Sequence, residues 1–224
     1  MRTLLVGHLG IGTIRLDAGE SHHLLRVLRA APGDAVRLVD GSGHEALGTV
    51  TSVSAGEAEV LATELRSSAP APTRIVLLGV PRPALLDEAL LLGTETGATA
   101  FWLLPADRSQ VHAVRGERLA RVVDAAIKQC GRTDRPSIRE FSSLTGALAA
   151  LAPDLARFAA TPGGGAAPPV GGGAAVAVGP EGGWSPGEAA WLAESGFAPL
   201  GLGPHVLRAP TAVAAALVAL GSAP

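Results

Sequence analysis

One short stretch, a strand followed by a glycine-rich turn and a helix start, constrains the fold more than any other part of the sequence. The apolar run Ala174–Val178 predicts a buried strand, and residues 179–183 after it contain three glycines and a proline. A helix is expected next, because Ser185 suits the N-cap, Pro186 the first helical position and Glu188 the third position of a capping box. Such a turn presents backbone N–H groups at the end of a strand, so it predicts a small-molecule site.

Two common nucleotide-binding motifs are absent from this turn. The sequence has no G-x-x-x-x-G-K-[ST] phosphate loop and no G-x-G-x-x-G motif that opens a helix after a strand. An ATPase or a dehydrogenase is therefore a poor interpretation.

The first third of the chain carries short alternating apolar runs broken by turn signals, which is typical of a small antiparallel barrel or sandwich. The runs cover residues 13–16, 35–39, 46–53 and 58–65, and one helix is predicted at 21–29. The Pro- and Ser-rich segment 67–72 predicts a linker. We therefore expect two domains, at residues 1–68 and 73–224.

After the linker, predicted strands alternate with predicted helices, which favours a parallel α/β sheet. The strands are expected at 75–80, 100–104, 174–178 and 197–200, and the helices at 83–96, 118–130 and 210–220. The last helix is apolar nearly all round, so we expect it to be buried in the domain or against a partner subunit. The Gly/Pro/Ala-rich segment 160–173 is expected to be mobile or disordered.

Composition excludes several classes of protein. The formal net charge of −2 argues against a protein that coats nucleic acid indiscriminately, and no apolar run approaches the ~20 residues that span a bilayer. No signal sequence is recognised and the lone Cys130 fits a reducing compartment, so a cytoplasmic location is expected. The six histidines show no pair at ligand spacing, and no metal is expected.

Positive charge is nevertheless concentrated between residues 108 and 139, a stretch that contains eight basic and three acidic residues. The basic residues are Arg108, Arg115, Arg118, Arg121, Lys128, Arg132, Arg135 and Arg139. A solvated helix face and a phosphate-contacting patch both explain this stretch. The same two interpretations apply to His22, His23, Arg26 and Arg29 in the first predicted helix.

Four separated groups of residues, taken together, resemble one family. They are the segment 22–29 with Gly33-Asp34 and Asp40-Gly41; Gln129-Cys130-Gly131-Arg132 with Pro136; Val178-Gly179-Pro180-Glu181-Gly182-Gly183 with Glu188; and Leu200-Gly201 with Val206-Leu207-Arg208 and Thr211-Ala212. The sequence is similar in this order, over nearly its whole length, to the RsmE family of 16S rRNA uracil-N3-methyltransferases of the SPOUT superfamily.

The resemblance implies a fold class and a reaction. Members have a small PUA-like β-barrel domain for RNA, followed by an α/β SPOUT methyltransferase domain tied in a C-terminal trefoil knot. They act as cytoplasmic homodimers that use S-adenosyl-L-methionine to methylate N3 of a uridine in 16S rRNA or the small ribosomal subunit, with no membrane or DNA partner.

The resemblance also implies site residues. Cofactor binding is expected at Ala160, Thr161, Val178, Gly179, Pro180, Glu181, Gly182, Gly183, Leu200, Gly201, Leu202, Gly203, Val206, Leu207, Arg208 and Thr211. RNA binding is expected at His22, His23, Arg26, Arg29, Arg108 and Arg132. Arg132 and Arg208 are candidates for holding phosphate or stabilising charge on the uracil oxygens, and Glu181 for accepting a proton or bracing the turn.

Two positions depart from the family pattern. Pro210 stands where members usually have a carboxylate, and Arg82 stands where many have a lysine. Two alternatives therefore stay open: an RNA-binding or ribosome-assembly protein of the same fold with weak or no catalysis, and a SPOUT enzyme with another rRNA target, such as a ribose 2′-hydroxyl.

Overall fold

A computed structural model of the chain describes residues 2–54, 56–110, 116–168 and 170–221. The chain divides into two compact units, Met1–Pro70 with Asp124–Arg135, and Ala71–Val123 with Pro136–Pro224. Residues 124–135 thus group with the first unit, although they follow the first two strands of the second unit in the chain. No helix in the described ranges is long and apolar enough to cross a membrane.

The first unit is built on a five-stranded sheet with the strand order β1-β3-β4-β5-β2. The strands are β1 (Arg2–Leu5), β2 (Gly12–Arg15), β3 (Ala35–Val39), β4 (His44–Ser54) and β5 (Glu57–Ser67). β1 runs parallel to β3, and the other neighbours are antiparallel. Buried and exposed positions alternate in the first half of β4, so one face carries the core of this unit, as the sequence pattern predicts.

The helix expected at 21–29 begins earlier and changes its geometry. Asp17 caps α1 (Ala18–His22) by accepting the backbone N–H of Glu20 at 2.8 Å, and the chain continues as a π-helical turn, η1 (His23–Val27). Arg29 then adopts a φ of 50°, and it is the only described residue other than glycine with a positive φ. The expected helix bounds were wrong because the spacing of apolar residues indicates neither the N-cap at Asp17 nor a π-helical turn.

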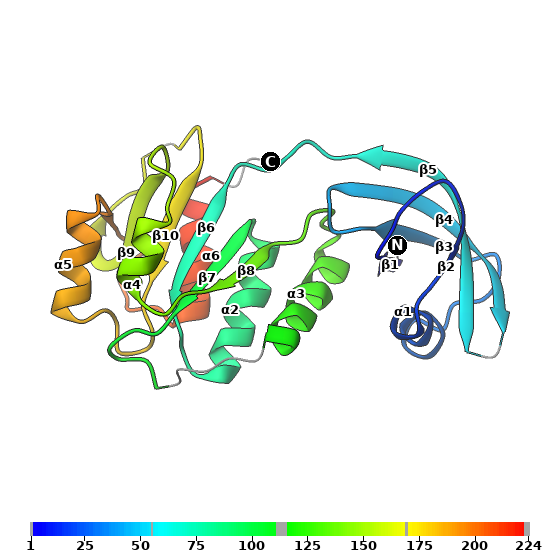
Figure 1. The fold of residues 1–224 in the computed structure, drawn as a ribbon, viewed down its shortest axis with the longest axis horizontal. Coiled ribbons are helices and arrows are strands. Elements are labelled where there is room, and N and C mark those ends of the chain that lie inside the picture. Colours follow the sequence, from blue (N-terminus) through cyan, green and yellow to red (C-terminus); the bar gives the residue numbers. More distant parts are fainter. Residues whose placement is uncertain (1, 55, 111–115, 169, 222–224) are drawn as a thin grey trace. The chain divides into compact units, whose positions relative to one another are not determined.

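The second unit contains a six-stranded sheet in which all neighbours are parallel, with the order β11-β9-β10-β6-β7-β8 (Figure 1). The strands are β6 (Arg74–Gly79), β7 (Ala100–Leu104), β8 (Ser137–Glu140), β9 (Ala156–Gly165), β10 (Ala174–Val178) and β11 (Ala198–Leu200). The helices that follow β6 are α2 (Pro83–Glu95), α3 (Gly116–Cys130), α4 (Leu144–Ala149), α5 (Pro186–Glu194) and α6 (Ala209–Ala219). α3 begins in the second unit, and its residues from Asp124 onward belong to the first unit.

Helices cover both faces of this sheet, which explains why β7 and β10 are apolar throughout. α2 and α6 pack together against one face, where a Cβ on Gly93 would lie 2.6 Å from the ring of Phe101. On the other face, Leu77 and Trp102 pack in one cluster with Leu192 of α5 and with residues of α4. α6 is buried along most of its length, as its apolar sequence predicts.

The expectation of a mobile or disordered loop at 160–173 was wrong for its first part. β9 extends to Gly165 and pairs with both β10 and β11. The composition of this part, rich in Gly and Pro, concealed the strand, which pairs with β11 again only at Gly165, opposite Leu200. β1, β8 and α4 were also missed, since each is short. The trefoil knot stays a prediction, as do the domain limits at 1–68 and 73–224.

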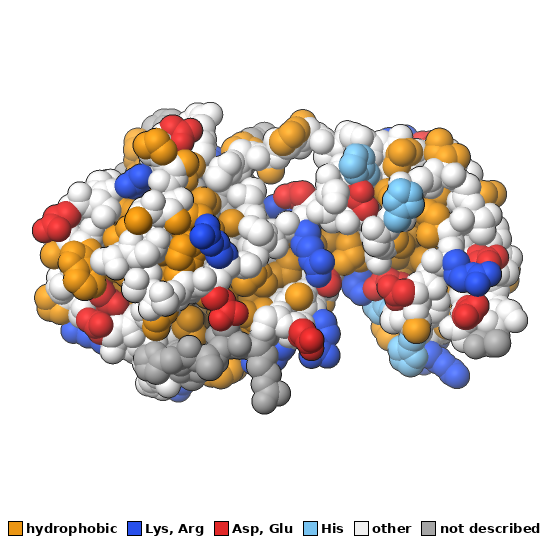
Figure 2. Space-filling view, viewed as in Figure 1, with side chains coloured by type: hydrophobic (Ala, Val, Ile, Leu, Met, Phe, Trp, Pro, Cys, Tyr) orange, Lys and Arg blue, Asp and Glu red, His pale blue; other side chains and the backbone are white. Residues whose placement is uncertain are grey.

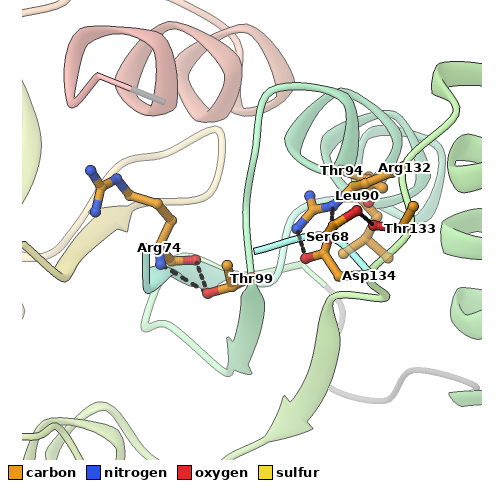
Figure 3. A network of polar contacts seen from close by, with 8 residues as sticks. All are labelled: Ser68, Arg74, Leu90, Thr94, Thr99, Arg132, Thr133 and Asp134. Carbon is orange, nitrogen blue, oxygen red and sulfur yellow. Dashed lines mark hydrogen bonds and ion pairs between the residues drawn. The ribbon is translucent and has the colours of Figure 1, made fainter. Parts of the chain in front are cut away.

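A buried arginine ties the start of β6 to the end of α6. Arg74 is 3 % exposed, and its guanidinium donates to the carbonyl oxygens of Thr73 (3.0 Å), Gly172 (2.6 Å), Leu220 (3.3 Å) and Gly221 (3.1 Å). Figure 3 shows its backbone hydrogen-bonded to Thr99. Burial lowers the pKa of this guanidinium, and no carboxylate of the described residues pairs with it.

We expect Arg74→Met to lower the free energy of unfolding by about 1–3 kcal/mol, because buried carbonyl oxygens lose their donors. Urea unfolding followed by circular dichroism measures this change. The matched control is Arg66→Met, since Arg66 is an exposed strand residue paired with Glu64, and we expect a change within about 0.5 kcal/mol. Equal effects of the two substitutions would contradict a stabilising role for the Arg74 contacts.

Candidate functional site

A cavity of about 330 Å³ lies in the second unit, where β9 and β10 end. Its lining comprises Ala160, Thr161, Pro162, Val178, Gly179, Pro180, Glu181, Gly183, Trp184, Ala189, Leu202, Gly203, His205, Val206, Leu207, Ala209 and Ala212. The carboxyl ends of parallel strands are where α/β sheets bind ligands, and the volume falls in the range of small-molecule sites.

The first wall of the cavity is an irregularity in β9. Pro199 pairs with Ala159, but the next residue, Leu200, pairs with Gly165, so the intervening residues of β9 leave the ladder. Three of them, at 160–162, line the cavity. The backbone N–H of Gly201 donates to Gly165 O at 2.8 Å, and a Cβ on Gly201 would lie 2.1 Å from Gly164 O. The two segments reach this separation because both are glycine-rich.

The second wall is the glycine turn that the sequence predicts. Gly183 has a φ of +68° and donates its N–H to Pro180 O at 2.8 Å. The predicted capping box is confirmed: Ser185 Oγ accepts the Glu188 N–H at 3.3 Å, and Glu188 Oε2 accepts the Ser185 N–H at 2.8 Å. The start of α5 therefore fixes the end of the turn.

The buried Glu188 also holds a second loop. The residue is 2 % exposed, and its Oε1 accepts the backbone N–H of Asp107, in the loop after β7, at 2.9 Å. The carboxylate of Asp107 in turn accepts the Ser185 hydroxyl. Arg108 Nη1 donates to Gly182 O at 2.8 Å. The loop after β7 is thus tied to the glycine turn, and the sequence carried no signal for this contact beyond two charged residues after an apolar strand.

Glu181 lines the cavity but is held in an ion pair. Its Oε1 accepts from Arg82 Nε at 2.8 Å and from the Arg82 backbone N–H at 3.2 Å. Burial raises the pKa of Glu181, but hydrogen bonds from the Arg82 side chain and from the backbone of both residues outweigh it, so the pKa lies below its ordinary value. A carboxylate stabilised in its charged form is a weak proton acceptor, which favours bracing of the turn.

Some predicted cofactor residues do not line the cavity. These are Gly182, Leu200, Gly201, Arg208 and Thr211, and all but Leu200 are next to residues that do. Arg208 precedes the first residue of α6, and its Nη2 lies 3.4 Å from Glu88 Oε1. Arg132 belongs to the first unit, where it makes two hydrogen bonds to the Asp134 carboxylate (Figure 3).

Six lining residues were missed from the sequence: Pro162, Trp184, Ala189, His205, Ala209 and Ala212. Trp184 has its indole Nε1 buried without a hydrogen-bond partner among the described residues. His205 had been grouped with ordinary surface histidines. Trp184 and His205 each follow a predicted cofactor loop within two positions. This closeness in the sequence is the one feature that could have predicted them as lining residues.

The predicted RNA-binding residues occupy both units. His22, Arg26 and Arg29 are exposed at the surface of the first unit, and His23 is half-buried there. Arg108 is exposed beside the glycine turn of the second unit. Their predicted role stays a prediction.

Half of the eight basic residues at 108–139 are neutralised by acidic partners. Four of its members are ion-paired: Arg118 with Asp87, Lys128 with Glu20, Arg132 with Asp134 and Arg135 with Asp124. Arg139 stacks on Phe141, with its guanidinium carbon 4.4 Å from the ring centre, and Arg115 lies outside the described residues. In the face shown in Figure 2, basic side chains lie among acidic ones. These contacts favour a solvated face over a continuous phosphate patch.

No group of three or more His, Cys, Asp or Glu side chains that could hold a metal ion occurs in the described part of the chain. One of the histidines considered from the sequence, His112, lies outside that part.

Two family models match the sequence. An RNA methyltransferase domain covers residues 69–221, and an RNA methyltransferase PUA domain covers residues 16–62. Among characterised relatives, the ribosomal RNA small subunit methyltransferase E of Mycobacterium bovis is 32 % identical over 92 % of this chain and 85 % of its own. The protein of the same name from Synechocystis is 29 % identical over 94 % and 73 %, respectively.

Solved structures show the same similarity. Ribosomal RNA small subunit methyltransferase E from Neisseria gonorrhoeae, bound to S-adenosyl methionine, has a TM-score of 0.87 and 25 % identity over 98 % of this chain and 96 % of its own. A probable rRNA-methyltransferase from Porphyromonas gingivalis has a TM-score of 0.78 and 28 % identity over 91 % and 90 %. The predicted fold class, a SPOUT-type α/β methyltransferase domain preceded by a PUA-like domain, is confirmed.

We expect Glu188→Gln to lower the free energy of unfolding by about 1–3 kcal/mol, because an amide presents its NH₂ to one of the two backbone N–H groups. Urea unfolding at neutral pH measures the change. Glu194→Gln is the control on the same helix, since Glu194 is exposed. A Glu188 variant as stable as the Glu194 variant would show that the brace contributes nothing.

We expect the stabilisation by Glu181 to depend on pH. Because its folded pKa lies below the ordinary 4.5, the contribution is present above about pH 4.5 and is lost as the pH falls through the folded pKa. The difference in free energy of unfolding between the wild type and Glu181→Gln should therefore shrink between about pH 6 and about pH 3. Urea unfolding across this range tests it, and a constant difference would argue against the ion pair.

Proposed function

The chain belongs to the family of ribosomal RNA small subunit methyltransferase E, and we propose that it methylates N3 of a uridine in 16S rRNA with S-adenosylmethionine as methyl donor. The observation that carries the proposal is the cavity at the ends of β9 and β10, which is built from the loops where the sequence predicts the cofactor.

The lining residues suit this cofactor. Val178, Ala209 and Ala212 form a buried apolar floor for an adenosyl group, and the 179–183 turn adds backbone polar groups. The unpartnered indole N–H of Trp184 is a free donor beside them. Bound S-adenosylmethionine would supply an electrophilic methyl group, held by the residues of the three loops at 160–162, 178–184 and 202–207.

The chemistry then falls to the chain's own side chains. N3 of uracil carries a proton, so its loss leaves negative charge that spreads onto the uracil oxygens. We assign the stabilisation of that charge, or contacts to RNA phosphate, to Arg208 and Arg132, because a guanidinium donates two parallel hydrogen bonds to such groups. We assign Glu181 to bracing the turn through Arg82.

RNA contacts are assigned to the PUA-like domain at 1–68 and to the surface of the methyltransferase domain at 73–224. The exposed His22, Arg26 and Arg29, the neighbouring His23 and the exposed Arg108 support this division. We place the reaction in the cytoplasm, where small ribosomal subunits are assembled.

A homodimer is part of the proposal. α2 and α6 pack together, yet Leu91 of α2 and Val218 of α6 are 37 % and 63 % exposed. Exposed apolar side chains on adjacent helices support a protein interface.

One observation favours a second candidate, an RNA-binding protein of this fold with little or no catalysis. Pro210 occupies the first turn of α6 and is buried, so the position that usually carries a carboxylate in the family has no charge here. Proline suits this position for helix geometry, since the first turn leaves its N–H groups unbonded.

Calorimetry with S-adenosylmethionine and mass spectrometry of nucleosides separate the two candidates. The enzyme should bind the cofactor, and a deletion strain should lose 3-methyluridine from its small-subunit rRNA and regain it with the wild-type gene. Failure of the folded protein to bind S-adenosylmethionine would favour the non-catalytic protein. Unchanged 3-methyluridine with loss of another methylated nucleoside would assign a different rRNA target.

A further inference from the structure

We propose that His205 accepts the N3 proton of the target uridine. The assignment rests on the proposed function and adds a residue that its chemistry requires. Methyl transfer to N3 needs a free lone pair on that nitrogen. In neutral uracil N3 is bonded to a proton, which has to leave first. A proton acceptor beside the cofactor cavity is therefore necessary, and the cavity offers few candidates.

His205 lies where the cavity opens. The floor residues Val178, Ala209 and Ala212 are buried, whereas the stretch 203–206 is exposed, with Val206 82 % exposed. A cofactor seated on the floor leaves the exposed side for a base that arrives from solution. The imidazole is thus placed on the side of the cavity that the RNA must approach.

The other ionisable groups near the cavity are engaged. Among the described residues that line it, only Glu181 and His205 have ionisable side chains, and Glu181 is paired with Arg82. The lining residues of β9, α5 and α6 carry no ionisable group. Just outside the lining, Arg208 lies near Glu88, and a guanidinium has no lone pair available to accept a proton.

The carboxylates behind the glycine turn are also occupied. Glu188 accepts two backbone N–H groups, and Asp107 accepts the Ser185 hydroxyl. Each of these carboxylates is thus already engaged as a hydrogen-bond acceptor. Within the part of the chain that the structure describes, no hydrogen bond or ion pair engages the His205 ring, which leaves an imidazole nitrogen available.

The step balances without a further reagent. A neutral imidazole nitrogen of His205 takes the proton from uracil N3, and the electron pair of that N–H bond becomes the lone pair that bonds the methyl carbon. The carbon–sulfur bond breaks with its electrons passing to sulfur, which becomes a neutral thioether. The imidazolium then releases its proton to water. An imidazole suits this role because it changes charge between about pH 5 and 8.

The test is the pH dependence of methyl transfer to small-subunit RNA by the wild type and by His205→Gln. We expect wild-type activity to fall as imidazoles become protonated toward about pH 5. His205→Gln should be about 10²- to 10⁴-fold slower near neutral pH and should lack this acid limb. Its affinity for S-adenosylmethionine, measured by calorimetry, should change far less than its rate, because the other residues of the three loops still hold the cofactor. His8→Gln, which replaces an exposed histidine of the first unit, should behave like the wild type.

A second measurement does not depend on turnover. We expect the ring resonances of His205 in the RNA-free protein to shift when S-adenosylmethionine is added, and those of His8 to stay in place. A shift at His205 alone supports its place beside the bound cofactor, and its absence counts against it.

The outcomes separate this assignment from the function on which it rests. The role of His205 alone would be overturned if the wild type forms 3-methyluridine and the His205→Gln variant has a similar rate and the same acid limb. A wild type that binds S-adenosylmethionine but yields no 3-methyluridine at any pH would overturn both. A Gln variant that loses the acid limb and the rate while keeping cofactor affinity supports both.

Discussion

The buried carboxylate of Glu188 is the interaction on which the geometry of the cavity depends. A single side chain accepts hydrogen bonds from Ser185, which ends the glycine turn, and from Asp107, which follows a different strand. Burial of the Glu188 side chain makes these hydrogen bonds costly to lose, since an unpaired buried carboxylate is left without its acceptor contacts. The turn therefore stays in one conformation although glycine gives its backbone wide freedom.

A second constraint acts on the opposite wall. Gly164 and Gly201 bring two backbones closer together than any side chain would permit, and this contact forces β9 out of its ladder to line the cavity. The wall formed by the glycine turn is thus held by the Glu188 carboxylate, and the wall formed by β9 is held by the close approach of two glycine backbones. Rigid walls of this kind lower the cost of binding, because little ordering accompanies the ligand.

Charge pairing decides which groups are left for chemistry. The carboxylates around the cavity accept hydrogen bonds from Arg82, from backbone N–H groups or from a hydroxyl. Four of the eight basic residues at 108–139 are likewise paired with acidic residues, two of which lie far away in sequence. The structure therefore sorts ionisable residues into those that maintain the fold and a small number, such as His205 and Arg108, that remain accessible.

The sequence by itself determined the features whose causes are local. The strand Ala174–Val178, the glycine turn, the capping box at Ser185 and the apolar α6 all follow from neighbouring residues, and most of the predicted cofactor loops line one cavity. Only the tertiary structure decided that β9 is a strand, that Asp107 contacts the turn, that Arg82 pairs with Glu181 and that His205 opens onto the cavity. Each of these depends on partners about 30 to 100 residues apart in the chain, or on hydrogen bonds supplied by another strand, and no local pattern encodes such partners.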